Sequence, residues 1–363
     1  MKKEPKAQAA SPGKRTRKSD KIAMEPDERQ KGKTEVKSGL SHSAVLMNIG
    51  KCLLLIIIIP PFLNYASLQR EGQMLLPKDG RIFDVGLGQR MHLLCKGQGK
   101  PVVILDAPTG MSSDIWFHVQ ESVATITKVC TYDRIGLGFS KRLMQNETTG
   151  TEKVWGISTT GRMVDDLHRL LLAAEIAMPV ILVGSEIGTL NSRFYSHIHD
   201  VYGKLLPSLQ AKQFSAASGL SRLLIILGAI EPTIKENVSE EIIQRQKYLL
   251  SNPAHQSSAV DEHYFLNESA AQVRDITKYK PLSSRTSVSV ITGDSFDQQI
   301  PQHLNQMVAT LQKKFLEESY PSANHLHIKG GDRRMIYTKP SAIIQHLRTL
   351  VNQRQDKHGQ VNK

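Results

Sequence analysis

Cysteine is scarce in this chain, whose 363 residues contain only Cys52, Cys95 and Cys130. Three thiols so far apart in the sequence form no metal-ligand cluster, so we expect neither a metal site nor a cofactor held by cysteine. Charged residues are a modest 22% of the chain, against 40% hydrophobic residues. This composition predicts a substantial core and room for one large α/β domain or two smaller ones.

Residues able to form a core are almost absent from the first 40 positions, where twelve Lys and Arg stand against six Asp and Glu. We therefore expect a disordered basic tail over residues 1–42. The run Lys14-Arg-Thr-Arg-Lys18 fits a nuclear signal or a nucleic-acid patch, but it equally fits a solvated tail beside a membrane segment. The segment that follows favours the tail, and we expect no nucleic-acid partner.

One long hydrophobic run is present, and residues 44–63 have about the length needed to cross a hydrocarbon core. We predict a transmembrane signal anchor over residues 43–65, with a cleaved signal peptide or an interfacial helix as alternatives. Lys51 interrupts the run, and Pro60 and Pro61 are expected to break the helix near its far end. The basic tail before the span predicts a cytosolic N-terminus and a lumenal or extracellular folded domain.

Three glycosylation sequons follow the span, and none precedes it. Their acceptors are Asn146, Asn237 and Asn267, which agrees with the predicted orientation although such triplets also occur by chance. Cys95 and Cys130 each fall in a predicted strand. They can form a disulfide in an oxidising lumen if the strands are neighbours, or they are two small buried hydrophobic residues.

The chain from residue 81 alternates strands and helices. Short apolar runs predict strands, and apolar residues at helical spacing predict helices between them. Strands separated by helices indicate an α/β fold with a mostly parallel sheet covered on both faces. The expected elements are a hairpin over 81–87 and 90–95, strands at 101–107, 128–133, 180–183, 287–292 and 325–328, helices at 114–124, 159–174, 190–199, 301–315 and 340–351, and a mostly helical stretch to about residue 280.

Several motifs occur in the order and spacing of an α/β-hydrolase, which the chain resembles most clearly over residues 81–200. They are Pro101-Val-Val-Ile-Leu-Asp-Ala-Pro-Thr-Gly110, Trp116, Tyr132-Asp-Arg-Ile-Gly-Leu-Gly-Phe-Ser140, Asp165-Asp-Leu-His168 and Leu182-Val-Gly-Ser-Glu-Ile-Gly188. The resemblance implies a hydrolase-like core in two parts, residues 81–202 and 281–354, with a helical cap over 203–280 between them and a disordered tail over 355–363. In this family the strand-to-helix turn after the fifth strand, the elbow, holds the nucleophile.

The elbow keeps Gly184 and Gly188, but Glu186 stands where the resemblance places the nucleophilic serine. Ser185 lies one position early, which would point its side chain away from the site. The position of the catalytic histidine holds Asp332, and a carboxyl with an ordinary pKa is a poor base at neutral pH.

The third triad position, the acid, is best matched by Asp297, with Asp294 as a second choice. His325 and His327 fall within a predicted strand, before the loop that carries the base position, so we interpret them as structural. An acid that orients a histidine has no catalytic use alone. The resemblance implies oxyanion-hole donors at the backbone of Thr109 and Ile187.

The resemblance also implies a core strand soon after residue 200, and the sequence shows no β-pattern there. Either this version of the chain lacks that strand, or the apolar segment 223–227 replaces it. A missing strand would leave sheet edges that a stable protein normally pairs or covers.

These departures predict a membrane-anchored, catalytically inactive relative of the hydrolases that binds a small hydrophobic ligand or a protein partner. Losing the nucleophile or the base removes most of the rate enhancement of a triad. The alternative is a hydrolase that acts on ester, epoxide or halide bonds with Glu186 as an unconventional nucleophile.

Overall fold

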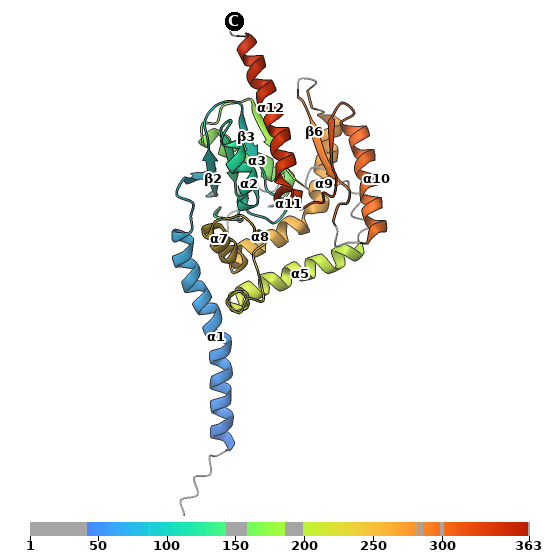
Figure 1. The fold of residues 1–363 in the computed structure, drawn as a ribbon. Coiled ribbons are helices and arrows are strands. Elements are labelled where there is room, and N and C mark those ends of the chain that lie inside the picture. The colour runs from blue at the N-terminus through green and yellow to red at the C-terminus, as the bar shows by residue number, and fades with distance from the viewer. Residues whose placement is uncertain are drawn as a thin grey trace, which may run out of the picture. The chain divides into compact units, whose positions relative to one another are not determined.

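The computed structural model describes a chain that divides into two compact units, residues 1–50 and 51–363. The sheets and all helices after the first belong to the second unit (Figure 1). The described residues are 42–86, 88–142, 158–185, 199–280, 282–283, 286–297 and 301–361.

A single long helix, α1, spans His42–Met74 and contains both Pro60 and Pro61. The expectation that these prolines end the helix is wrong. Proline removes a backbone donor and crowds the preceding turn, but the turn that follows is held from outside, because Asn64 Nδ2 donates to the carbonyls of Ala216 and Ser251. The helix therefore continues past the predicted end of the anchor.

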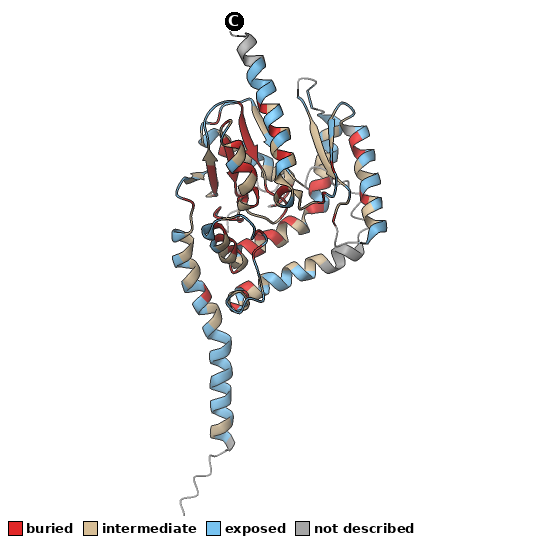
Figure 2. Cartoon of the chain, viewed as in Figure 1, coloured by how far each residue is buried: buried red, intermediate tan, exposed pale blue. Residues whose placement is uncertain are grey.

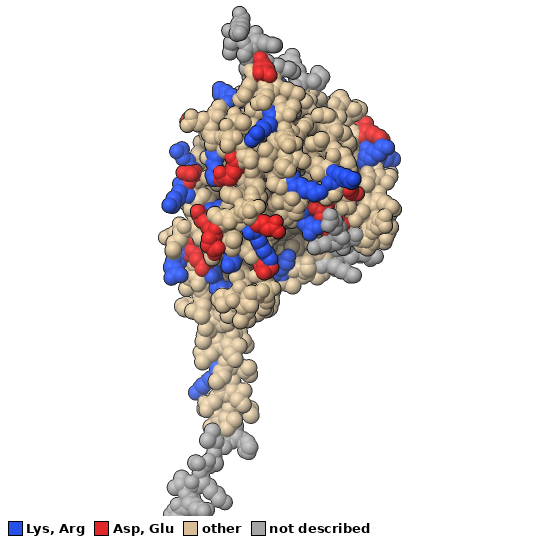
Figure 3. All heavy atoms as spheres, viewed as in Figure 1, with Lys and Arg blue, Asp and Glu red and all other residues tan. Residues whose placement is uncertain are grey.

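Among the described residues, α1 is the one helix whose length and composition allow it to cross a membrane, with a mean hydropathy of 2.1 over its best window. Its first half is exposed almost all round (Figure 2). Its surface is nearly free of charge (Figure 3), because residues 52–69 contain no Lys, Arg, Asp or Glu. By length and composition, α1 is therefore a candidate membrane span.

The central sheet has five strands in the order β1-β2-β4-β3-β5. β1 (Gly80–Asp84) and β2 (Arg90–Lys96) form the predicted antiparallel hairpin. β3 (Val102–Leu105) lies parallel to both β4 (Val129–Tyr132) and β5 (Val180–Val183). The predicted α/β fold with a mostly parallel core is therefore confirmed.

Cys95 of β2 and Cys130 of β4 face each other directly in the antiparallel register. The structure joins them in a disulfide with an S–S distance of 2.07 Å. Cys52 is a free, exposed thiol on α1.

Helices cover both faces of this sheet. On one face, α2 (Phe117–Val123) and α12 (Pro340–Val361) pack against β3 and β4, burying Val103, Leu105, Val119, Leu347 and Val351. On the other, α3 (Thr160–Ala173) buries Leu170 against Ile104 and Cys130. The apolar positions at helical spacing in α3 face the sheet, as the sequence predicts. α12 continues to Val361, beyond the helix end at residue 351 that the sequence predicts.

The last two strands form a separate sheet, in which β6 (Ser289–Gly293) and β7 (Asn324–Ile328) run parallel. No strand lies along the chain between β5 and β6 in the described segments, and β5 ends the central sheet with Leu182 60% exposed. Residues after 199 form α5 (His199–Ala217). The apolar segment 223–227 belongs to the end of α6 (Leu220–Ile226), so the hypothesis that it replaces the strand is wrong.

The helical stretch predicted for the cap is present as α5, α6 and three further helices. These are α7 (Glu240–Leu250), α8 (Pro253–Tyr264) and α9 (Leu266–Tyr279). The remaining elements are a 3₁₀ turn η1 (Ser113–Trp116), α10 (Gln302–Ser319) and the short α11 (Met335–Thr338).

Candidate functional site

The loops after β3, β4 and β5 form the carboxyl edge of the central sheet, where ligands bind in α/β folds. Asp106 follows β3, and Asp133 and Arg134 follow β4. Glu186 and Ile187, the predicted elbow residue and one predicted oxyanion donor, lie outside the described residues. The site is therefore built from the described groups at this edge of the sheet.

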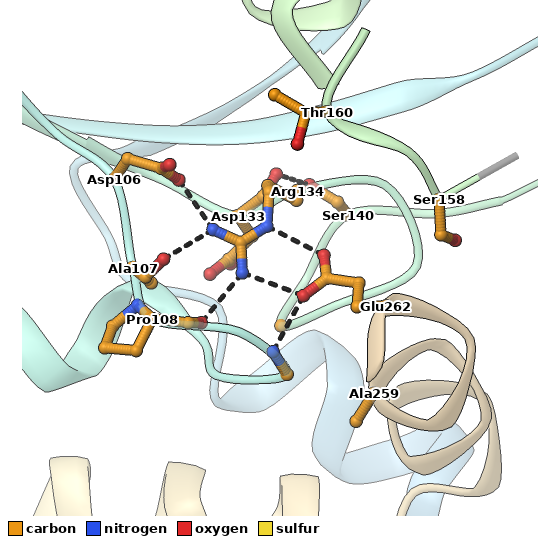
Figure 4. Close-up of polar contacts among 12 residues, drawn as sticks. Asp106, Ala107, Pro108, Asp133, Arg134, Ser140, Ser158, Thr160, Ala259 and Glu262 are labelled. Carbon is orange, nitrogen blue, oxygen red and sulfur yellow. Dashed lines mark hydrogen bonds and ion pairs between the residues drawn. The ribbon is translucent and has the colours of Figure 1, made fainter. Parts of the chain in front are cut away.

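The guanidinium of Arg134 is the centre of these groups (Figure 4). It carries five N–H donors in a fixed planar arrangement, and all five are used. Nε and Nη2 donate to the two carboxylate oxygens of Glu262, at 2.7 and 2.9 Å. Nη1 donates to Asp106 Oδ1 at 2.6 Å and to the carbonyl of Ala107 at 2.5 Å. Nη2 also donates to the carbonyl of Pro108 at 2.8 Å. Since Glu262 lies on α8, Arg134 ties the cap to the sheet edge.

Burial makes this contact strong. The side chains of Arg134 and Glu262 are 4% and 3% exposed. Burial alone would lower the Arg134 pKa, but the charges of Glu262 and Asp106 outweigh it and hold that pKa well above its usual value. Removing one partner of such a pair leaves a buried, unpaired charge and costs about 3–5 kcal/mol.

The loop after β3, which carries the predicted oxyanion donor Thr109, is held by the same pair. Arg134 binds the carbonyls of Ala107 and Pro108, and the Gly110 N–H donates to Glu262 Oε2 at 2.7 Å. The Thr109 hydroxyl is buried with no hydrogen-bond partner among the described residues. Buried hydroxyls are normally paired, so this oxygen is the unsatisfied polar atom of the loop.

Asp133 organises the turn that follows β4. Its carboxylate accepts from His92 Nδ1 at 2.9 Å and from the backbone N–H groups of Ser113 and Phe139 at 2.7 and 3.0 Å. Burial alone would raise its pKa, but the hydrogen bond and charge of His92, with the two N–H groups, lower the pKa to about 2. Gly138 (φ +54°) passes so close to this carboxylate that a Cβ would collide with it.

The space beside Arg134 is nearly filled. The described residues leave a cavity of about 10 Å³, lined by Met91, Ser158, Met163 and Glu262 among others. A volume of this size holds at most about one water molecule. In the described part of the chain, the cavity beside Arg134 therefore has room for about one water molecule.

A larger cavity of about 230 Å³ lies between β2, α2 and α7. Asp114 and Arg245, which line it, pair at 2.9 Å. Burial raises the Asp114 pKa in spite of Arg245. Arg245 also pairs with Glu241 at 2.9 Å, so three of the charged side chains that line this cavity bind one another.

The predicted acid and base positions both hold a carboxylate bound to arginine. Asp297 pairs with Arg333 Nε at 2.6 Å, and Asp332 Oδ2 accepts from Arg334 Nη2 at 2.8 Å. Both carboxylates are buried, with 6% and 4% of their side chains exposed. An arginine stays protonated at any physiological pH, so it cannot serve as a general base.

The second acid candidate, Asp294, is paired with a histidine. His327 Nε2 lies 2.7 Å from Asp294 Oδ1, and the Gly330 N–H donates to Asp294 Oδ2 at 2.6 Å. The Gly330 N–H, with His327, lowers the Asp294 pKa. His327 lies within β7, as predicted for both histidines of that strand, and its side chain is 58% exposed.

Sequence reasoning missed the roles of Arg134, Glu262 and Arg333. Arg134 stands inside the motif after β4, and Arg333 directly follows Asp332, so arginines beside the motif positions were a usable signal. Glu262 lies 128 residues from Arg134 in a cap helix without a motif. Only the packing of α8 on the sheet edge identifies it.

The remaining predicted sites lie apart from this cluster. Asn237 and Asn267 are exposed, and Asn146 lies outside the described residues. Within the described segments, no group of His, Cys, Asp and Glu side chains could hold a metal ion.

The strand order, the cap and the motif positions together define an α/β-hydrolase fold. Two epoxide hydrolases share it, the Cif enzyme of Acinetobacter nosocomialis (12% identity, TM-score 0.56, covering 80% of this chain and 96% of that one) and an enzyme of Vigna radiata (14%, 0.56, 76% and 99%). A putative lipase of Acinetobacter baumannii is also similar, with 16% identity, a TM-score of 0.51 and coverage of 81% and 97%. At these identities the likeness concerns the fold.

No family model matches the chain. Among curated proteins, the probable transporter efuK of Hormonema carpetanum is 31% identical over 102 residues, which are 28% of this chain. The chain matches only 13% of the length of that relative.

Proposed function

We propose that this protein is a membrane-anchored, catalytically inactive α/β-hydrolase-like protein that acts by binding a small hydrophobic ligand or a protein partner. The observation that carries the proposal is the pairing of Asp297 with Arg333 and of Asp332 with Arg334. Where the triad needs an imidazole held by a carboxylate, the chain has carboxylates neutralised by guanidinium groups.

The chemistry follows from these pairs. A triad works because the histidine takes the proton of the nucleophile and returns it to the leaving group. In this chain the carboxylates of Asp297 and Asp332 bind Arg333 and Arg334, so neither orients an imidazole. With Glu186 in the serine position, neither the attack nor the proton transfer has its usual group.

The cap supports a binding role. Arg134 and Glu262 fix α8 to the loop after β3, and His255 Nδ1 of the same helix accepts from the Gly138 N–H at 3.0 Å. These contacts give the cap a defined position over the sheet edge. A fixed surface of this kind suits recognition of a partner or ligand, because little order is lost on binding.

Membrane anchoring rests on α1, with the basic tail before it. The tail predicts a cytosolic N-terminus, and the disulfide between Cys95 and Cys130 supports an oxidising, lumenal or extracellular location for the folded domain. The exposed acceptors Asn237 and Asn267 agree with that side.

The test is a search for turnover by the purified full-length protein in detergent. We expect no labelling by a fluorophosphonate serine probe and no hydrolysis of a series of esters and epoxides above that of a heat-inactivated sample. Steady turnover that is lost in the E186Q variant would contradict the inactive assignment.

The alternative is a hydrolase with Glu186 as nucleophile, and the Asp294–His327 pair favours it. A histidine held by a carboxylate is the group that activates water against an ester intermediate. In that case, mass spectrometry after incubation with an epoxide would find an adduct on Glu186, and H327A would accumulate it. Absence of the adduct in both proteins excludes this chemistry.

A further inference from the structure

The second half of α1 turns one face toward the cap. Asn64, 2% exposed, donates from Nδ2 to Ala216 O at 2.9 Å and to Ser251 O at 3.0 Å. Figure 1 shows α5, which ends at Ala217, reaching α1. An amide that binds the carbonyls ending two different helices fixes the position of both.

α6 is attached to the same face of α1. Arg222 Nη1 and Nη2 donate to the two carboxylate oxygens of Glu71 at 2.7 and 2.8 Å, and its Nε donates to Asn64 Oδ1 at 2.8 Å. Gly219, which precedes α6, lies so close to the backbone of Pro60 that no side chain would fit there. Because Gly219 contacts Pro60, α6 starts at the level of Pro60 along α1. The bidentate pair of Arg222 and Glu71 is geometrically specific, so it fixes α6 in that position.

The outer face of α6 is apolar and uncovered. Leu220, Leu223, Ile226 and Leu227 are 44%, 44%, 73% and 78% exposed, and their spacing puts them on one side of the helix. We call these four residues the α6 apolar surface. Scattered exposed leucines are ordinary, but four on one helix face mark an interaction surface.

The position of α6 along α1 identifies what covers this surface. Residues 44–63 span about 30 Å at 1.5 Å per residue, which is about the hydrocarbon thickness of a bilayer. Pro60 lies three residues before the end of that run, or about 4.5 Å of helix rise. A helix that starts beside Pro60 therefore lies at the boundary between acyl chains and headgroups.

We propose that the α6 apolar surface inserts into the interface of the bilayer that α1 spans, so that the cap rests on the membrane beside its own anchor. The inference rests on the proposed membrane anchor. The charge of Arg222 does not oppose insertion, because its guanidinium is bound by the carboxylate of Glu71 and by Asn64 Oδ1. Apolar residues on one face of a short helix are the usual means of such shallow insertion.

The experiment uses the full chain, with C52S to remove the free thiol, reconstituted into phosphatidylcholine vesicles. A polarity-sensitive fluorophore is placed at position 226 (I226C), at 57 in the span (I57C) or at 172 (L172C), and lipids carry a quencher near the headgroup or deep in the acyl chain. Leu172 on α3 is the matched control, because it is an equally apolar exposed side chain, 65% exposed, outside the cap.

We expect the fluorescence of the probe at 226 to shift to the blue and to be strongly quenched by the shallow quencher. The probe at 57 should be quenched by the deep quencher. The probe at 172 should show no blue shift and no quenching by either lipid. Introducing I226E and L227E together should abolish the quenching of a fluorophore placed at position 223 (L223C). The same two substitutions should leave the quenching of the fluorophore at position 57 unchanged. Quenching at 57 alone overturns the inference and leaves the anchor standing. If neither the probe at 226 nor the probe at 57 is quenched, the membrane anchor itself is contradicted. A blue shift at 226 without quenching by either lipid overturns the inference and means that a second copy of the chain covers the α6 apolar surface.

Discussion

The guanidinium of Arg134 and the carboxylate of Glu262 form two parallel hydrogen bonds, of 2.7 and 2.9 Å, between the end of β4 and the cap helix α8. Glu262 also accepts from the Gly110 N–H. One carboxylate therefore holds together the cap, the loop after β3 and the loop after β4.

We predict that E262Q lowers the free energy of unfolding by about 3–5 kcal/mol, because it leaves Arg134 buried with less opposing charge. Chemical denaturation of the full-length protein measures the change. The matched control is D261N, the neighbouring position on α8, whose more exposed pair with Arg142 should contribute less than about 1 kcal/mol. Equal effects of the two variants would contradict the role assigned to Glu262.

The same pair can be tested by replacing both partners. The double variant R134M/E262M should recover part of the stability lost in R134M, since it no longer leaves the Glu262 carboxylate buried without a partner, whereas Asp106 loses Arg134 in both variants. A double-mutant cycle from denaturation midpoints gives the coupling. Additive losses would show that the two residues act independently.

We predict that stability falls as the pH drops below the ordinary histidine range, because His255 is buried and neutral. Burial lowers its pKa from 6.5 to about 4, so between these values the unfolded chain binds a proton that the folded chain does not. By linkage, stability is full above about pH 6.5 and decreases by roughly 3 kcal/mol as the pH approaches 4.

The variant H255N tests this dependence, since asparagine keeps an acceptor for the Gly138 N–H but does not titrate. Its stability should change less with pH than that of the parent protein over the same range. If H255N retains the full slope, the pH dependence arises elsewhere.

Loss of the disulfide should also destabilise the folded domain. Cys95 and Cys130 are 35 residues apart, and closing a loop of that length stabilises by roughly 3–4 kcal/mol in the chain-entropy description. We expect C95A/C130A to unfold at lower denaturant concentration and C52S to match the parent. Mass mapping without reduction should recover the peptides of Cys95 and Cys130 linked; free thiols at both positions would exclude the bond.

The predicted orientation places the exposed acceptors Asn237 and Asn267 on the glycosylated side of the membrane. We expect N237Q and N267Q each to remove one endoglycosidase-sensitive shift in gel mobility of the protein expressed in eukaryotic cells. A protein without glycans whose folded domain is open to cytosolic protease would contradict the orientation.

Much of the fold was predictable because it depends on local pattern. The hairpin of β1 and β2, the buried strands β3 to β5 and the amphipathic α3 follow from periodicity that a few neighbouring residues carry. The continuation of α1 beyond Pro61 was not predictable, because distant carbonyls of Ala216 and Ser251 hold the next turn.

The candidate site divides in the same way. The sequence alone identified the α/β-hydrolase pattern and the carboxylates at positions 297 and 332, since motif order and residue type are local properties. Only the tertiary structure decided what those carboxylates bind, that Arg134 meets Glu262 across 128 residues, and that β6 and β7 form their own sheet. Such contacts depend on how the cap and the last two strands pack, and no local pattern encodes which distant charges that packing brings together.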